Sequence, residues 1–124
     1  MSDTVLIVDD EPNIVKMVEA RLKSNGYEVL TATGGEEGLH KCKRHKPDAV
    51  VLDILMPDMD GSAVAAAIRE DPDTRKIPII FLTGIIKPNE VPKSREIGGQ
   101  YFITKPFNSR DLLDILNHAL GNKE

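Results

Sequence analysis

Side chains that could perform phosphoryl chemistry follow four apolar segments of this sequence. They are Asp9 and Asp10, Asp53, Thr83 and Lys105, which come after residues 5–8, 49–52, 79–82 and 101–104 respectively. Short apolar runs rich in β-branched residues and separated by helical patterns are typical of buried parallel strands. The carboxyl ends of such strands lie along one edge of the sheet, where ligands bind. We therefore expect three carboxylates, a hydroxyl and an ammonium group to meet at that edge.

Each of these residues has a plain structural interpretation when it is taken alone. Asp53 could cap a turn, Asp9 and Asp10 could favour a helix N-terminus, and Thr83 and Lys105 could be an ordinary strand end and a solvated lysine. Their occurrence together favours a functional site over these separate structural roles. Three neighbouring carboxylates repel one another unless a cation lies among them, and Mg²⁺ is the hard cation that prefers oxygen ligands. A carboxylate can also attack phosphorus to form a mixed anhydride.

The elements that must position these residues alternate between strand and helix. A further strand is expected at residues 27–31, and helices are expected at 12–25, 36–45, from Ser62 to about 71, and 109–120. Pro92 belongs in a first helical turn, so the helix before the last strand should start late and be short. Right-handed crossovers between such units give an α/β fold, a doubly wound (βα)5 sheet with helices on both faces.

Size and composition limit the possible functions. The 124 residues indicate a single domain over 1–124, and the net charge of −4 argues against direct binding to nucleic acid or to an anionic membrane. No apolar run approaches the length of a membrane span, and the N-terminus lacks a signal-peptide pattern. Cys42 is the single cysteine, which is typical of a reducing, cytoplasmic location.

The motifs around these residues resemble a known family. They are Val8-Asp9-Asp10-Glu11, the stretch from Asp53 to Gly61 (DILMPDMDG), Thr83-Gly84 and Lys105-Pro106-Phe107. In this order, each after an expected strand, they are similar to the receiver domain of bacterial response regulators, including the chemotaxis regulators. The resemblance implies a flavodoxin-like, five-stranded parallel sheet of order 2-1-3-4-5, in which the first and third strands are neighbours at the switch point.

The resemblance also assigns roles to the site residues. Asp53 would be the phosphorylated residue, and Asp10 and Asp53 would bind Mg²⁺ directly. Asp9 would act mainly through water, and the main-chain carbonyl of Leu55 would complete the protein ligands. Lys105 would pair with a phosphoryl oxygen.

Thr83 and Phe102 are the expected switch residues. By resemblance, Thr83 would hydrogen-bond the phosphoryl group and move with it, and Phe102 would occupy the place of an aromatic residue that follows this movement. Phe102 has no hydroxyl group to bond. Strand alternation directs the neighbouring Tyr101 to the opposite face of the sheet.

As a receiver, this chain would be a phosphorylation-dependent signalling switch of a two-component system. A sensor histidine kinase or phosphotransfer protein would donate the phosphoryl group, and a downstream output domain or protein would respond. A homodimer through the fourth-helix, fifth-strand and fifth-helix face is possible.

Two other functions remain open from the sequence. A metal-dependent phosphatase with an aspartyl intermediate usually has a second carboxylate near the nucleophile, whereas Ile54 and Leu55 follow Asp53. We therefore do not expect a multiple-turnover enzyme. An interaction module that is never phosphorylated is disfavoured by the complete set of Asp9, Asp10, Asp53, Thr83 and Lys105.

Overall fold

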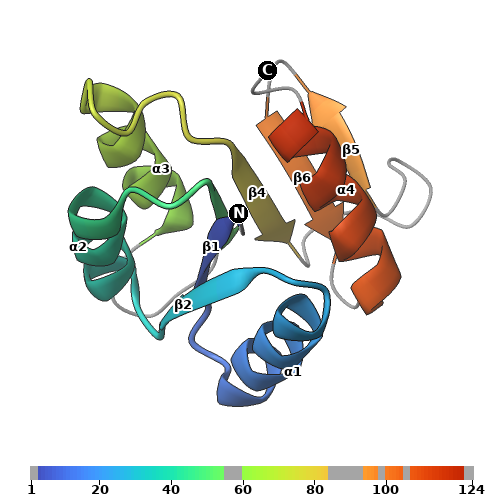
Figure 1. The fold of residues 1–124 in the computed structure, drawn as a ribbon. Coiled ribbons are helices and arrows are strands. Elements are labelled where there is room, and N and C mark those ends of the chain that lie inside the picture. The colour runs from blue at the N-terminus through green and yellow to red at the C-terminus, as the bar shows by residue number, and fades with distance from the viewer. Residues whose placement is uncertain (1–2, 55–59, 84–93, 98–99, 105–106, 122–124) are drawn as a thin grey trace.

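The computed structural model describes residues 3–54, 60–83, 94–97, 100–104 and 107–121. Strands and helices alternate along most of this chain (Figure 1). The elements are β1 (Thr4–Val8), α1 (Pro12–Ser24), β2 (Glu28–Ala32), α2 (Gly35–His45), β3 (Ala49–Asp53), α3 (Gly61–Glu70), β4 (Ile79–Thr83), β5 (Ser94–Ile97), β6 (Gln100–Thr104) and α4 (Ser109–Gly121). No helix in the described ranges is long and apolar enough to cross a membrane.

The strands form one sheet in the order β2-β1-β3-β4-β6-β5. The first five of these, β2, β1, β3, β4 and β6, run parallel, which confirms the predicted flavodoxin-like order 2-1-3-4-5. β1 and β3 are neighbours, with Val8 level with Leu52, so the residues that follow them emerge side by side.

The sixth strand corrects one expectation. Residues 94–97, where a short fourth helix was expected, form β5, which pairs antiparallel with β6. Ile97 is level with Gln100, and the two intervening residues are Gly98 and Gly99. A pair of glycines between two strand segments is a strong hairpin signal. Here this signal agrees with the observed pairing of β5 and β6, whereas Pro92 on its own indicates the start of a helix. The dimer face expected from the resemblance therefore has a strand at 94–97.

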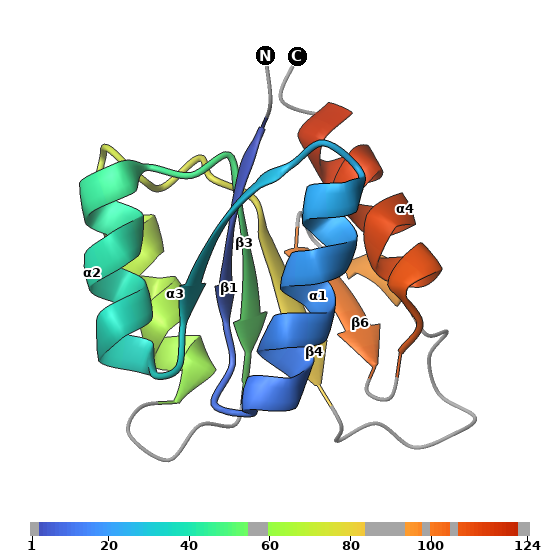
Figure 2. The same cartoon turned by 60° about the horizontal axis from the view of Figure 1, so that its bottom comes forward.

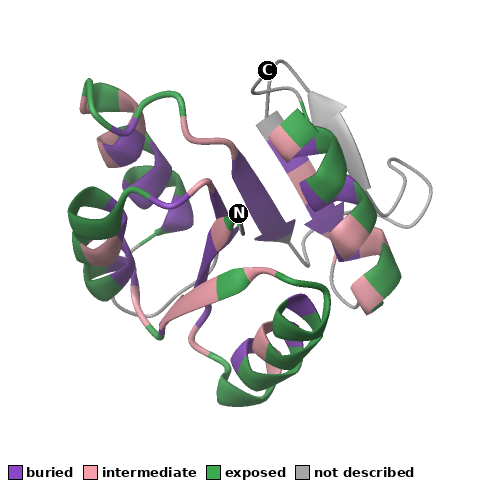
Figure 3. Ribbon diagram, in the orientation of Figure 1, coloured by how far each residue is buried: buried purple, intermediate pink, exposed green. Residues whose placement is uncertain are grey.

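The sheet is covered on both sides (Figures 1 and 2). α1 and α4 lie on one face, and α2 and α3 lie on the other. Every position of β3 is buried, because both faces of a parallel sheet pack against helices. Figure 3 shows the same burial along β4. Alternate residues enter alternate cores. Val5, Ile7 and Val51 pack toward α1 and α4, and Leu6 and Leu52 pack toward α2 and α3.

The helix boundaries follow local chemistry. Pro12 occupies the first turn of α1, where a missing N–H costs no hydrogen bond. Gly26 follows the helix with a φ of 91°, a left-handed conformation that glycine adopts without strain. Asn108 caps α4 by accepting the Asp111 N–H across 2.8 Å. These features fix the points at which the chain leaves and rejoins the sheet.

Candidate functional site

The three predicted carboxylates meet at the carboxyl edge of the sheet. Asp9 and Asp10 directly follow β1, and Asp53 is the last residue of β3. One carboxylate oxygen from each residue lies within 4.8 Å of the others. This juxtaposition comes from the β1–β3 pairing, which brings residues 44 positions apart along the chain to the same level. The expectation that these acids meet is confirmed, and their chemical roles remain predictions.

Two of these carboxylates are almost completely buried. Asp9 is 0% exposed and Asp53 is 5% exposed, while Asp10 is half-buried. One carboxylate oxygen of Asp9 (Oδ1) accepts the Glu11 N–H across 2.9 Å, and its own N–H donates to the Ala32 carbonyl across 3.1 Å. Withdrawing carboxylates from water is costly unless they are hydrogen-bonded or paired with a cation. Three carboxylate groups at this spacing offer the oxygen ligands that suit Mg²⁺, so the donor set fits this ion.

The other predicted site residues follow neighbouring strands. Thr83 ends β4, where its backbone is level with Thr104 at the end of β6. Lys105 comes directly after Thr104, and Leu55 comes directly after Ile54. The Thr83 side chain, Lys105 and Leu55 lie outside the part that the structure describes. The strands that lead to Thr83, Lys105 and Leu55 therefore end at the same edge of the sheet as the acids.

Phe102 and Tyr101 point to opposite faces, as strand alternation predicts. Tyr101 packs in the core beneath α1 and α4, whereas Phe102 packs in the core beside α3. Phe102 is half-buried and stacks on Phe81, with ring centroids 5.4 Å apart. This partner was not identified from the sequence, because it depends on the β4–β6 register that places Phe81 level with Phe102. The two rings line a groove with Ile54, Ser62, Ala65, Ala66 and Arg69.

Gly61 is a further residue at this edge to which the sequence analysis gave no role. It is the first residue of α3, and its N–H donates to the Ile54 carbonyl across 2.8 Å. Asp60 caps the same helix by accepting the Ser62 N–H across 2.8 Å. The start of α3 therefore touches the backbone that carries Asp53. Residue types alone do not reveal such a close approach of two backbone segments.

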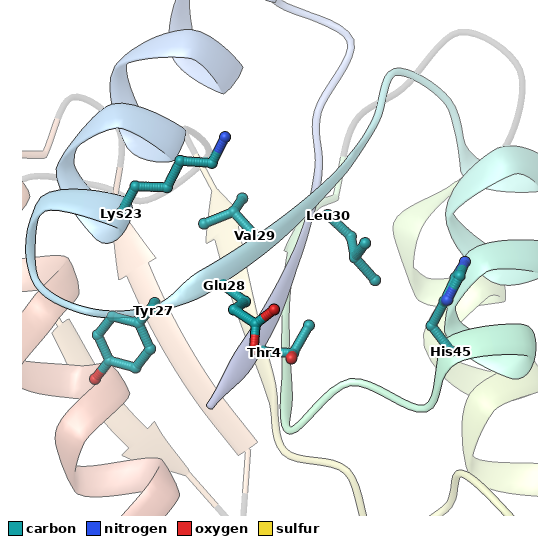
Figure 4. A pocket seen from close by; sticks show the side chains of 7 residues that line it. All are labelled: Thr4, Lys23, Tyr27, Glu28, Val29, Leu30 and His45. Atoms are coloured by element: carbon teal, nitrogen blue, oxygen red, sulfur yellow. The ribbon is translucent and has the colours of Figure 1, made fainter. Parts of the chain in front are cut away.

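A pocket at the opposite end of the sheet contains none of the predicted site residues. It lies along β2, between α1 and α2, and Figure 4 shows the seven side chains that line it. Lys23 at its rim pairs with Glu19, with 3.0 Å between Nζ and Oε2. We therefore assign the candidate function to the acidic edge.

Comparison with known proteins agrees with this geometry. The model of the response regulator receiver domain family matches residues 5–117. The flavodoxin-like sheet and the acidic cluster at its switch point agree with this match, and the chain belongs to the response regulator receiver domain family.

Individual relatives and solved structures resemble the chain over most of its length. It is 43% identical over 110 residues to the probable transcriptional regulator ycf27 of Guillardia theta, and this match covers 89% of the chain and 42% of the relative. Its structure superposes on the chemotaxis response regulator CheY4 of Vibrio cholerae with a TM-score of 0.84 and 34% identity, covering 96% and 99% of the two chains. The receiver domain of the sensor histidine kinase PA1611 from Pseudomonas aeruginosa, solved with a magnesium ion in its active-site cleft, gives a TM-score of 0.83 at 28% identity, covering 98% and 99%. The chain spans less than half the length of the curated relatives that it matches.

Proposed function

We propose that this chain is a phosphorylation-dependent switch in which Asp53 accepts a phosphoryl group. The observation that supports this function best is the cluster of Asp9, Asp10 and Asp53 at the carboxyl edge of the sheet, with one oxygen of each within 4.8 Å of the others. Asp53 is the member that ends a strand. Its backbone is level with Leu82 of β4, and the preceding residue, Leu52, is level with Val8 of β1. A nucleophile whose backbone is held in this way loses little conformational entropy when the phosphoryl donor binds.

The transfer step uses the Asp53 carboxylate as nucleophile. One of its oxygens attacks the phosphorus of a phosphohistidine donor, the P–N bond breaks, and the departing imidazole takes up a proton. The product is an acyl phosphate on Asp53. Lys105 would neutralise a phosphoryl oxygen, and the Thr83 hydroxyl would donate a hydrogen bond to another.

The same acids would hold the metal ion. Asp10 and Asp53 would be direct Mg²⁺ ligands, with Asp9 acting through water and the Leu55 carbonyl as a main-chain ligand. Bound Mg²⁺ supplies positive charge that offsets the negative charge of the phosphoryl oxygens and of the carboxylates. The burial of Asp9 and Asp53 supports this assignment, because a cation compensates for their loss of hydration.

The partners follow from this chemistry. A sensor histidine kinase or phosphotransfer protein would supply the phosphoryl group, and an output domain or protein would read the switch through Thr83 and Phe102. We place this exchange in the cytoplasm, and we expect neither direct binding to nucleic acid nor insertion into a membrane. A homodimer, if formed, would use the face that contains β6 and α4.

Intact-mass measurement tests the acceptor. Incubation with acetyl phosphate and Mg²⁺ should add the mass of one phosphoryl group to the parent protein, and Asp53→Asn should abolish the adduct. Asp60→Asn is a matched control, because Asp60 is an exposed acid at the start of α3 and asparagine is an equally good helix cap. This control should keep the adduct. An undiminished adduct on Asp53→Asn would exclude Asp53 as the acceptor.

An assay of multiple turnover distinguishes a phosphorylated switch from a phosphatase. The groove residue Ile54 follows Asp53 directly and offers no acid or base for a second proton transfer. We therefore expect no multiple turnover of a generic phosphate ester by the parent protein in Mg²⁺. Sustained product release that is lost in Asp53→Asn would instead identify an enzyme.

A further inference from the structure

The contact between Gly61 and the backbone of Asp53 has a consequence for the acidic site. A Cβ atom placed on Gly61 would lie 2.3 Å from the Asp53 carbonyl oxygen and 2.7 Å from the Ile54 Cα atom. Both neighbours are backbone atoms, so no side-chain rotation can relieve the overlap. The conformation of Gly61 does not itself require glycine, because its φ lies outside the left-handed region. The requirement at this position is therefore space.

The backbone of Asp53 has little room to yield. The Ile54 N–H donates to the Leu82 carbonyl across 3.1 Å, which ties the end of β3 to β4. On the other side, β3 pairs with β1 along Val5–Val8. The Asp53 side chain is 5% exposed and already packed. Any side chain at residue 61 must therefore move the end of β3, the start of α3, or both.

A shift of the end of β3 would alter the acidic cluster, because Asp53 is the last residue of that strand. One carboxylate oxygen each of Asp9, Asp10 and Asp53 lies within 4.8 Å of the others. Asp9 and Asp10 follow β1 and Asp53 ends β3, so this spacing depends on where β3 ends. The Gly61 N–H to Ile54 carbonyl hydrogen bond also joins the two ends of the segment that contains Leu55. Gly61 thus touches the backbone of Asp53 and Ile54, which carries one of the three acids.

We infer that Gly61 is a positioning residue for the acidic site, and that the absence of its side chain sets the place of Asp53 relative to Asp9 and Asp10. This inference rests on the proposed function, since it concerns the same carboxylates. Gly61 itself contacts neither metal nor phosphoryl group. Its effect acts through the Asp53–Ile54 backbone.

Gly61→Ala tests this inference when it is compared with a stability-matched control. Ile68→Ala is the control, because Ile68 is fully buried on the same helix but lies about two turns along it from Gly61. Gly61→Ala overlaps backbone atoms and Ile68→Ala leaves a cavity, so both variants should melt at lower temperature. Mg²⁺ affinity by calorimetry and the rate of phosphorylation by acetyl phosphate are then measured well below both melting temperatures. Gly61→Ala should weaken Mg²⁺ binding and slow phosphorylation at least tenfold, while Ile68→Ala should change each less than twofold.

Several outcomes would overturn the inference. The inference is wrong if Gly61→Ala binds Mg²⁺ and is phosphorylated as the parent protein is. It is also wrong if Gly61→Ala and Ile68→Ala lose Mg²⁺ affinity and phosphorylation rate to the same extent. If Gly61→Ala does not fold in buffer, the measurements are repeated in an osmolyte that favours compact states. A variant that stays unfolded there would show that Gly61 serves the whole fold rather than the site. Failure of the parent protein to bind Mg²⁺ or accept phosphate would instead refute the proposed function.

Discussion

Burial distinguishes two of the three acids of the site from the other charged residues. Among the described residues, Asp9 and Asp53 are the charged side chains that are almost completely buried. The sequence predicts their meeting because each follows an apolar run, and parallel strands end at a common edge. It does not predict the contact of Gly61 with Asp53 or the stack of Phe81 on Phe102, because these depend on register and on the distance between backbones.

Cys42 gives a residue-scale prediction about alkaline pH. Burial, helped by the negative charge of Asp71, raises the pKa of the Cys42 thiol to about 11. The pKa of a cysteine thiol in an unfolded chain is about 8.5, so as pH rises this thiol loses its proton in the unfolded chain before it does in the folded protein. The stability that this thiol contributes is complete below about pH 8.5 and is lost as pH rises toward 11. The free energy of unfolding in urea should therefore fall more steeply between pH 8 and 10.5 in the parent than in Cys42→Ala. Parallel pH dependence in the two proteins would contradict this assignment.

The regular elements were predictable where one local signal dominated. β1, β3, β4 and β6 match apolar, β-branched runs, and the last helix begins at Ser109 as its pattern indicates. The short helix expected with Pro92 in its first turn was wrong at residues 94–97, because the proline signal was preferred to the Gly98-Gly99 hairpin signal that follows it. Local preferences decide an element only when competing signals are absent. The outcome affects function, because β5 stands where a helical partner surface was expected.

The N-cap of α4 gives a prediction at the scale of an element. Asn108 accepts the Asp111 N–H across 2.8 Å, and it follows Phe107, which packs against the core under this helix. Asn108→Ala leaves that N–H without its acceptor and should lower the free energy of unfolding by about 1 kcal/mol. Asn108→Asp keeps the acceptor and should stay close to the parent. Chemical denaturation of the three proteins measures this difference, and equal stability of the alanine and aspartate variants would show that the cap contributes nothing.

At the scale of the whole molecule, the fold assembles a negative site in a protein that is already acidic. The net charge is −4, and three carboxylates are gathered at one edge by strand order alone. Their mutual repulsion opposes folding, while the packing of two cores on either side of the sheet favours it. We therefore expect the folded protein to gain stability when a cation binds among these acids.

Thermal unfolding with and without Mg²⁺ measures this gain. A ligand that binds only the native state adds about 2.7 kcal/mol at roughly 100 times its Kd, which corresponds to a rise in Tm on the order of 10 °C for a domain of this size. Asp10→Asn should raise the Tm of the metal-free protein, because it removes one of the repelling charges, and should abolish the rise with Mg²⁺. Asp114→Asn is the matched control, since Asp114 is exposed on α4 and its replacement changes the net charge equally. That variant should respond to Mg²⁺ as the parent does. If Mg²⁺ leaves the Tm of the parent unchanged, or if Asp114→Asn removes the response as fully as Asp10→Asn, then general charge screening rather than a site at Asp9, Asp10 and Asp53 governs the effect.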